Sequence, residues 1–144
     1  MRRLTQRPVA LLTAVATVAW LSAGCGSKSS TVTATTPTST TTETFTGTIS
    51  ANNGHTYPFV SSAGTLTLTL TSVVPDANVA LGISLGTWSG LACTVGTGLF
   101  NDTAKQGNVI TGQVSAIASL CARVYDGAGQ ITAPTTYVIT VVHP

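Results

Sequence analysis

Charged side chains are scarce in this chain of 144 residues, of which Asp, Glu, Lys and Arg together make up 7%. An average soluble protein has roughly 25%. The carboxylates are Glu43, Asp76, Asp102 and Asp126, and the histidines are His55 and His143. With so few general acids, general bases and metal ligands, we expect neither an enzyme nor a cofactor.

Positive charge is equally rare once the amino terminus is set aside. Arg2, Arg3 and Arg7 lie in a predicted export signal, so residues 25–144 keep three basic residues against four acidic ones, a net charge of −1. No basic surface is left to bind nucleic acid through the release of counterions.

Long hydrophobic runs are also missing, and the apolar run of residues 8–21 is too short to span a bilayer. Three arginines precede it and small residues follow it, which is the layout of a secretory signal peptide over residues 1–24. Ala23-Gly24-Cys25 resembles the lipobox of bacterial lipoproteins, although Leu21 stands one position earlier than expected. The resemblance implies lipidation of Cys25 by a diacylglycerol, with palmitate as the acyl chain. The alternative is ordinary cleavage that leaves Cys25 as a free thiol.

Large apolar residues are nearly absent from residues 26–42, which consist mostly of Ser and Thr. Such a segment buries too little surface to offset its ordering entropy. Together with Cys25, it predicts a disordered tether over residues 25–42 between an anchor and a folded domain of residues 43–144.

Alternation of apolar and polar residues marks the folded part, most clearly in residues 65–71, where leucine and threonine alternate. This period of two is typical of a half-buried strand. Similar patterns recur about eight times, separated by Gly, Pro, Asn and Asp turn formers, one of them Gly96-Thr97-Gly98. The sequence therefore predicts an all-β, two-sheet antiparallel sandwich of jelly-roll or immunoglobulin-like type.

Cysteine is limited to three residues, and two of them, Cys93 and Cys121, fall in different predicted strands. An exported chain enters an oxidising compartment, so we expect these two to form a disulfide. Two free buried thiols are the alternative. A zinc site of these cysteines with His55 and His143 lacks any closely spaced pair of ligands, and we expect no metal site.

Several motifs resemble the bacterial pre-peptidase C-terminal domain, a small sandwich found on many exported proteins. Residues 45–49 and 57–60 are similar to its opening strands, residues 64–70 to its central strand and residues 137–141 to its closing strand. Asp76-Ala77-Asn78-Val79-Ala80-Leu81 is similar to its Asp-Ala-Asp-Leu-x-Leu signature, with Asn78 in place of the second aspartate. The resemblance implies the sandwich fold and a tendency to bind surfaces or polymers.

The polar candidates have structural explanations. His55 follows Asn52-Asn53-Gly54 and is expected in an exposed hairpin, while His143 is the penultimate residue and is expected to fray. Each aspartate next to a turn former is expected to cap its own backbone, and Arg123 to pair with a carboxylate on a neighbouring strand. Calcium binding would require the fold to gather several of these carboxylates.

Trp88 is the candidate ligand-binding residue. It lies between Gly86 and Gly90, a pattern that favours a loop, where an indole could stack on a sugar. The alternative is that Trp88 packs over one end of the sandwich.

Taken together, these features predict a lipoprotein of the bacterial cell envelope, in the outer membrane or at the cell surface, held by its lipid anchor. Its sandwich is expected to bind a carbohydrate polymer or an envelope protein without catalysis. A structural spacer without a ligand and an accessory subunit of a secreted enzyme are the alternatives. An aromatic row on one sheet face would favour carbohydrate, and an apolar patch at a sheet edge would favour a protein.

Overall fold

The computed structural model describes residues 39–144, which form eight strands and no helix. The strands are β1 (Thr41–Ile49), β2 (Gly54–Ser61), β3 (Gly64–Val74), β4 (Leu81–Trp88), β5 (Cys93–Ala104), β6 (Val109–Val114), β7 (Ala118–Tyr125) and β8 (Thr135–His143). All of their pairings are antiparallel.

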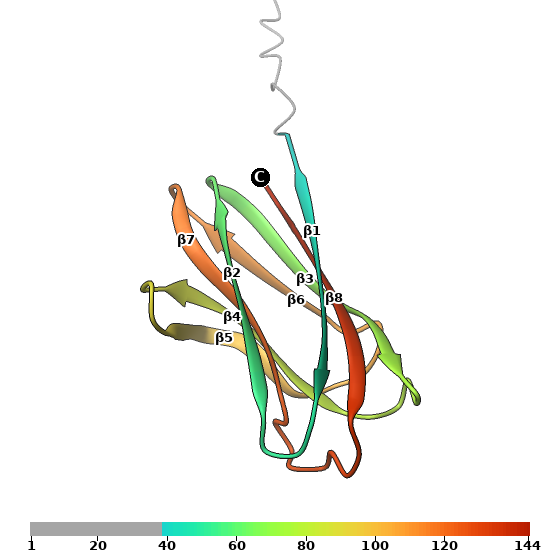
Figure 1. Ribbon diagram of the computed structural model, residues 1–144. Coiled ribbons are helices and arrows are strands. Elements are labelled where there is room, and N and C mark those ends of the chain that lie inside the picture. Colours follow the sequence, from blue (N-terminus) through green and yellow to red (C-terminus); the bar gives the residue numbers. More distant parts are fainter. Residues whose placement is uncertain (1–38) are drawn as a thin grey trace, which may run out of the picture. The chain divides into compact units, whose positions relative to one another are not determined.

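Two four-stranded sheets pack against each other, with strand orders β1-β8-β3-β6 and β2-β7-β4-β5 (Figure 1). This confirms the predicted all-β sandwich. The outermost strands are β1 and β6 in the first sheet and β2 and β5 in the second. Proline lacks an N–H for the ladder and is confined in sheets to such edges, which accounts for Pro58 within β2.

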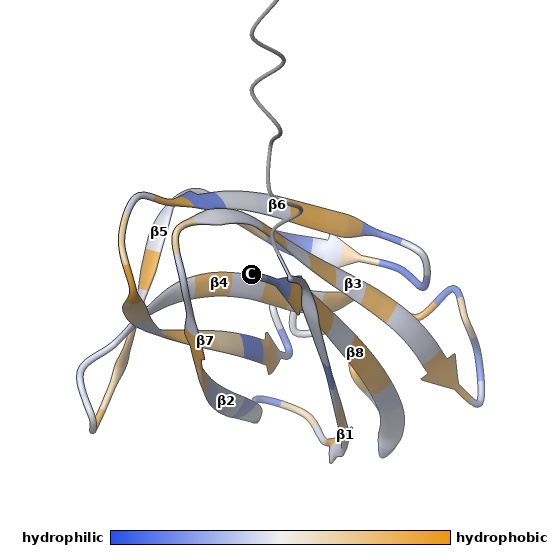
Figure 2. Ribbon diagram, turned by 90° about the horizontal axis from the view of Figure 1, so that it is seen from above, coloured by the Kyte–Doolittle hydropathy of each residue, from blue (hydrophilic) through white to orange (hydrophobic). Residues whose placement is uncertain are grey.

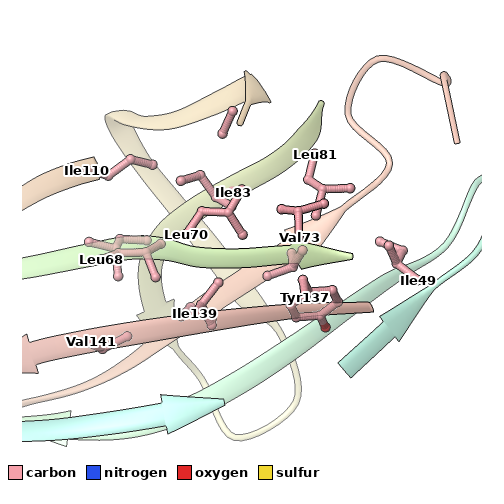
Figure 3. Packing of buried hydrophobic residues seen from close by; sticks show 14 of the residues in the cluster. Ile49, Leu68, Leu70, Val73, Leu81, Ile83, Ile110, Tyr137, Ile139 and Val141 are labelled. Atoms are coloured by element: carbon pink, nitrogen blue, oxygen red, sulfur yellow. The ribbon is translucent and has the colours of Figure 1, made fainter. Parts of the chain in front are cut away.

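The core lies between the sheets and follows from the alternation seen in the sequence. Leu66, Leu68 and Leu70 of β3 are buried, and the threonines between them face the other side of the sheet. Hydrophobic positions recur in the same way along β4 and β8 (Figure 2). Figure 3 shows side chains from these strands converging between the two layers.

β5 differs from the prediction, because Gly96-Thr97-Gly98 does not end a strand. The strand runs from Cys93 to Ala104 through these residues. Ser84 of β4 pairs with Phe100 while Gly86 pairs with Val95, so the residues between Val95 and Phe100 bulge from the ladder. Gly98 has a φ of 72°, which glycine adopts without a steric penalty, and the chain can therefore bulge without leaving the sheet.

The connections between strands alternate between the two ends of the sandwich. One end holds the start of β1 and the connections 62–63, 89–92 and 115–117, and we call it the apolar end. The start of β1 and residue 144 lie close together there (Figure 1). The other end, which we call the charged end, holds the connections 50–53, 75–80, 105–108 and 126–134.

Candidate binding face

Aromatic and charged side chains gather on the outer face of the β2-β7-β4-β5 sheet. Ser84 of β4 pairs with Arg123 of β7 on one side and with Phe100 of β5 on the other. Directly paired residues project from the same side of a sheet, so these three form one row across it. Tyr125 and Asp102 lie next to this row, towards the charged end. We call these five residues the Tyr125 face.

Tyr125 links two strands of this sheet across a glycine. Its ring lies over Gly82 of β4, where any Cβ would collide with the aromatic carbons. The phenol donates a hydrogen bond of 2.5 Å to Oδ1 of Asp102 on β5. Burial and this hydrogen bond raise the pKa of Tyr125 to about 12, against a smaller lowering by the charge of Arg123. The phenol therefore stays protonated at neutral pH and keeps Asp102 in place.

Arg123 is held against the same ring. Its guanidinium carbon lies 5.2 Å from the ring centroid of Tyr125, within the range of a cation–π interaction. The expected pairing with a carboxylate is wrong, since Arg123 forms no salt bridge within residues 39–144. The nearby acid, Asp102, bonds to the phenol instead, and the five N–H donors of Arg123 are left for other partners.

Ser84 contributes an unsatisfied hydroxyl to this face. Its side chain is fully buried between Arg123 and Phe100, and Oγ has no hydrogen-bond partner, the one such case among the buried side chains of residues 39–144. Phe100 beside it is 53% exposed. The Ser84 hydroxyl is therefore not accessible to a ligand, but the exposed ring of Phe100 next to the donors of Arg123 and the carboxylate of Asp102 offers both stacking and hydrogen bonding.

Trp88 does not lie in a loop, and that prediction is wrong. It is the last residue of β4 and pairs with Cys93. Its neighbour Thr87 pairs with the buried Leu120, so Trp88 points to the opposite, outer side of the sheet, which it shares with Phe100 and Tyr125. The indole is half-buried.

The predicted disulfide is confirmed, with 1.99 Å between the sulfur atoms of Cys93 and Cys121 and 5.9 Å between their Cα atoms. It ties β5 to β7 at the level of Gly86 on β4, which lies between them in the sheet. A Cβ on Gly86 would collide with the carbonyl of Thr94, so the glycine allows β5 to approach this closely. The bond therefore braces the sheet between Trp88 and the Tyr125 face.

The histidines serve the fold. His55 is partly exposed at the start of β2, and its Nε2 lies 3.0 Å from the carbonyl oxygen of Thr48. His143 does not fray, since it is 4% exposed, packs against the ring of Phe59 and bonds through Nε2 to Oε1 of Glu43 at 3.0 Å. Neither stands beside an activated nucleophile among the described residues.

Two of the aspartates hold turns, as expected. Oδ1 of Asp76 accepts hydrogen bonds from the backbone and side-chain nitrogens of Asn78. Asp126 accepts from the backbone N–H groups of Asn52 and Gln130 and so joins two connections of the charged end. No group of three metal-ligating side chains occurs within residues 39–144.

A second feature is a cavity of about 300 Å³ between the sheets, near the apolar end and beside β5 and β6. Its lining is mainly apolar and carries no charged side chain; it includes Leu66, Leu85, Val95, Leu99, Val114 and Leu120. Gln113, Thr87, Thr94 and Thr97 supply its polar side chains.

The predicted signal peptide and the lipidation site at Cys25 lie outside the described residues. Within the described part, no helix is long and apolar enough to cross a membrane. No model of a known protein family matches the chain, and no curated protein matches it. The resemblance to the pre-peptidase C-terminal domain therefore stays a prediction.

Proposed function

We propose that this protein is a lipid-anchored component of the bacterial cell envelope whose sandwich binds a carbohydrate polymer without catalysing a reaction. The anchor is inferred from the signal-like residues 1–24, which end at Ala23-Gly24-Cys25. The observation that carries the binding proposal is the Tyr125 face, where exposed Phe100 adjoins the hydrogen-bonded and stacked trio of Asp102, Tyr125 and Arg123.

The chemistry of this face fits a sugar better than an apolar peptide. A pyranose ring presents C–H groups on its faces and hydroxyls around its edge, so it stacks on an aromatic ring while bonding to polar groups beside it. Phe100 supplies the ring, Arg123 supplies donors, and Asp102 keeps one carboxylate oxygen without a protein hydrogen bond. Trp88 farther along the same face adds a second stacking position, which suits an extended polymer.

The absence of catalysis is proposed from how the charged groups are used. Glu43 is bonded to His143, Asp102 to Tyr125, and Asp126 to the backbone of two connections. Groups held in such structural bonds are poorly placed to move protons on a substrate.

A glycan array probed with the purified protein tests the proposal, followed by titration with any polysaccharide that binds. Phe100→Ala and Arg123→Ala should each weaken binding at least tenfold, since a stacked aromatic ring and a charge-assisted donor are typical energetic centres of an interface. The matched control is Val109→Ala, which removes an equally exposed apolar side chain from the outer face of the other sheet.

Binding that Phe100→Ala and Arg123→Ala leave unchanged would show that the Tyr125 face is not the site. Absence of any glycan binding, combined with recovery of a defined envelope protein that depends on Phe100, would show a protein partner. The anchor is tested separately, by the mass of the acyl group on Cys25 and by the release of Cys25→Ser from membranes.

A further inference from the structure

Exposed aliphatic residues are concentrated in the connections of the apolar end. Leu91 in the β4–β5 connection is 94% exposed and Ile117 in the β6–β7 connection is 74% exposed. Val60, one residue before the end of β2, is 57% exposed. Trp88 ends β4 at the same end of the molecule, half-buried on the outer face of its sheet.

Charge is distributed in the opposite way. The connections 62–63, 89–92 and 115–117 contain no Asp, Glu, Lys or Arg, whereas the charged end has Asp76, Lys105 and Asp126 in its connections. Glu43 lies in β1 near the apolar end, but its carboxylate is bonded to buried His143. The connections of the apolar end therefore present exposed aliphatic side chains and contain no charged side chain.

The chain also enters the sandwich at this end. The described residues begin at Ser39, and β1 starts at Thr41. The segment that leads back to Cys25 is therefore joined to the apolar end. Even fully extended, the residues between Cys25 and Ser39 reach at most roughly 50 Å.

We propose that the apolar end rests on the lipid bilayer, with Leu91 and Ile117 inserted into the headgroup region and Trp88 close to it. The inference rests on the proposed anchor, which would bring this end to the membrane. Hydrophobic tips without charge match the boundary between headgroups and acyl chains, and tryptophan is enriched at that depth.

This orientation assigns a role to side chains that the fold does not require. Moving an exposed aliphatic side chain from water into apolar surroundings lowers the free energy of the system. With the apolar end on the membrane, the charged end points away from it, and the Tyr125 face stands along the side of the sandwich, accessible to an external polymer.

The chain provides its own probe for the test. It has two tryptophans, Trp20 and Trp88, and removal of residues 1–24 leaves Trp88 alone. The processed, lipidated protein is incorporated into phosphatidylcholine vesicles, and emission from Trp88 is measured with lipids brominated at different depths along the acyl chain. Bromine quenches only at contact range, so we expect quenching that is strongest for the shallowest bromine position.

The double variant Leu91→Ser and Ile117→Ser should reduce that quenching at least twofold and shift the emission to longer wavelength, while lipidation is retained. Val74→Ser is the matched control, because Val74 is 53% exposed but lies at the charged end, and it should leave quenching unchanged.

Unquenched Trp88 in a protein whose acyl mass has been verified would overturn the proposed orientation and leave the anchor intact. An unmodified Cys25 would overturn the anchor instead. A concentration-dependent dimer that Leu91→Ser disrupts would show that the apolar end is covered by a second copy rather than by lipid.

Discussion

Different interactions order the connections at the two ends of the sandwich. At the charged end the connections are bonded to one another. Asp126 accepts a hydrogen bond from the backbone of Asn52, and its own N–H donates to the carbonyl of Asn53. The side-chain oxygen of Gln106 accepts a hydrogen bond from the backbone N–H of Val73, and the backbone N–H of Gln106 donates to the carbonyl of Ala77.

At the apolar end the connections are separate. The 89–92 connection is closed by bonds between Ser89 and Ala92 within itself, and the N–H of Ser62 donates to the carbonyl of Pro144. The disulfide between Cys93 and Cys121 supplies the covalent link across the sheet. Charged side chains therefore join the connections at one end, whereas the connections of the other end contain no charged side chain and lie beside a disulfide.

Breaking the disulfide should have the largest effect. Replacing Cys93 and Cys121 by alanine should lower the free energy of unfolding by roughly 3 kcal/mol, because the bond closes a long loop in the unfolded chain. Calorimetry with and without a reductant measures it. The wild type should lose stability on reduction, and the double variant should not respond. Equal melting temperatures for the two proteins under oxidising conditions would show that the apolar end is ordered without the bond.

Removing the Asp126 carboxylate at the charged end should have the second-largest effect on stability. Asp126→Ala should lower the free energy of unfolding by about 1–2 kcal/mol, since two backbone N–H groups lose a charged acceptor. Chemical denaturation gives the value. Asp76→Ala is the control, because its bonds stay within one exposed turn and its loss should cost under about 1 kcal/mol.

Alkaline pH should lower the free energy of unfolding, because Tyr125 near the charged end then loses its proton. The unfolded chain releases the Tyr125 proton near its ordinary pKa of 10.0, whereas the folded protein holds it to about 12. The stability that this phenol contributes is therefore fully present below pH 10 and is lost as pH rises towards 12. Urea unfolding at several pH values should show a shallower alkaline decline for Tyr125→Phe than for the wild type.

Part of that decline should remain in Tyr125→Phe. Burial and the bond to the Tyr57 hydroxyl, at 2.8 Å, also raise the pKa of Tyr137. An unchanged pH profile for Tyr125→Phe would show that the contact with Asp102 contributes nothing to stability.

The smallest effects are expected for the exposed aliphatic residues. Leu91→Ser and Ile117→Ser at the apolar end, and Val74→Ser at the charged end, should each change the free energy of unfolding by less than about 0.5 kcal/mol. Thermal denaturation in the absence of lipid measures these changes. A loss above 1 kcal/mol for Leu91→Ser would mean that its side chain supports the fold, which would contradict the membrane role proposed for it.

Most of the strands could be predicted because their pattern is local. The alternation around Leu66 and Leu68 is visible in the sequence and decides which side chains enter the core. Arg123 and Tyr125 likewise share a face because they are two residues apart in one strand. Their partner Asp102 belongs to another strand, and the register that brings it to Tyr125 could not be read from the sequence.

The errors came from interactions between distant parts of the chain. His143 is ordered by Phe59 and by Glu43, the latter 100 residues away. Gly96-Thr97-Gly98 predicts a turn because glycine is common in turns, yet pairing with β4 keeps β5 in the sheet on both sides of the bulge. The glycines around Trp88 predict a loop for the same reason, but pairing with Cys93 keeps Trp88 in β4.

Pro58 has a consequence for many copies of the protein held side by side. Anchored molecules share a two-dimensional surface, where the exposed edges of their sheets meet far more often than in free solution. An edge strand that can hydrogen-bond to the same edge of a neighbouring molecule would then start aggregation. Pro58 leaves β2 without one N–H, and the bulge of β5 interrupts the opposite edge of the same sheet. Edge-to-edge pairing of this sheet with a second copy is thereby disfavoured, which would keep the Tyr125 face open on molecules anchored as we propose.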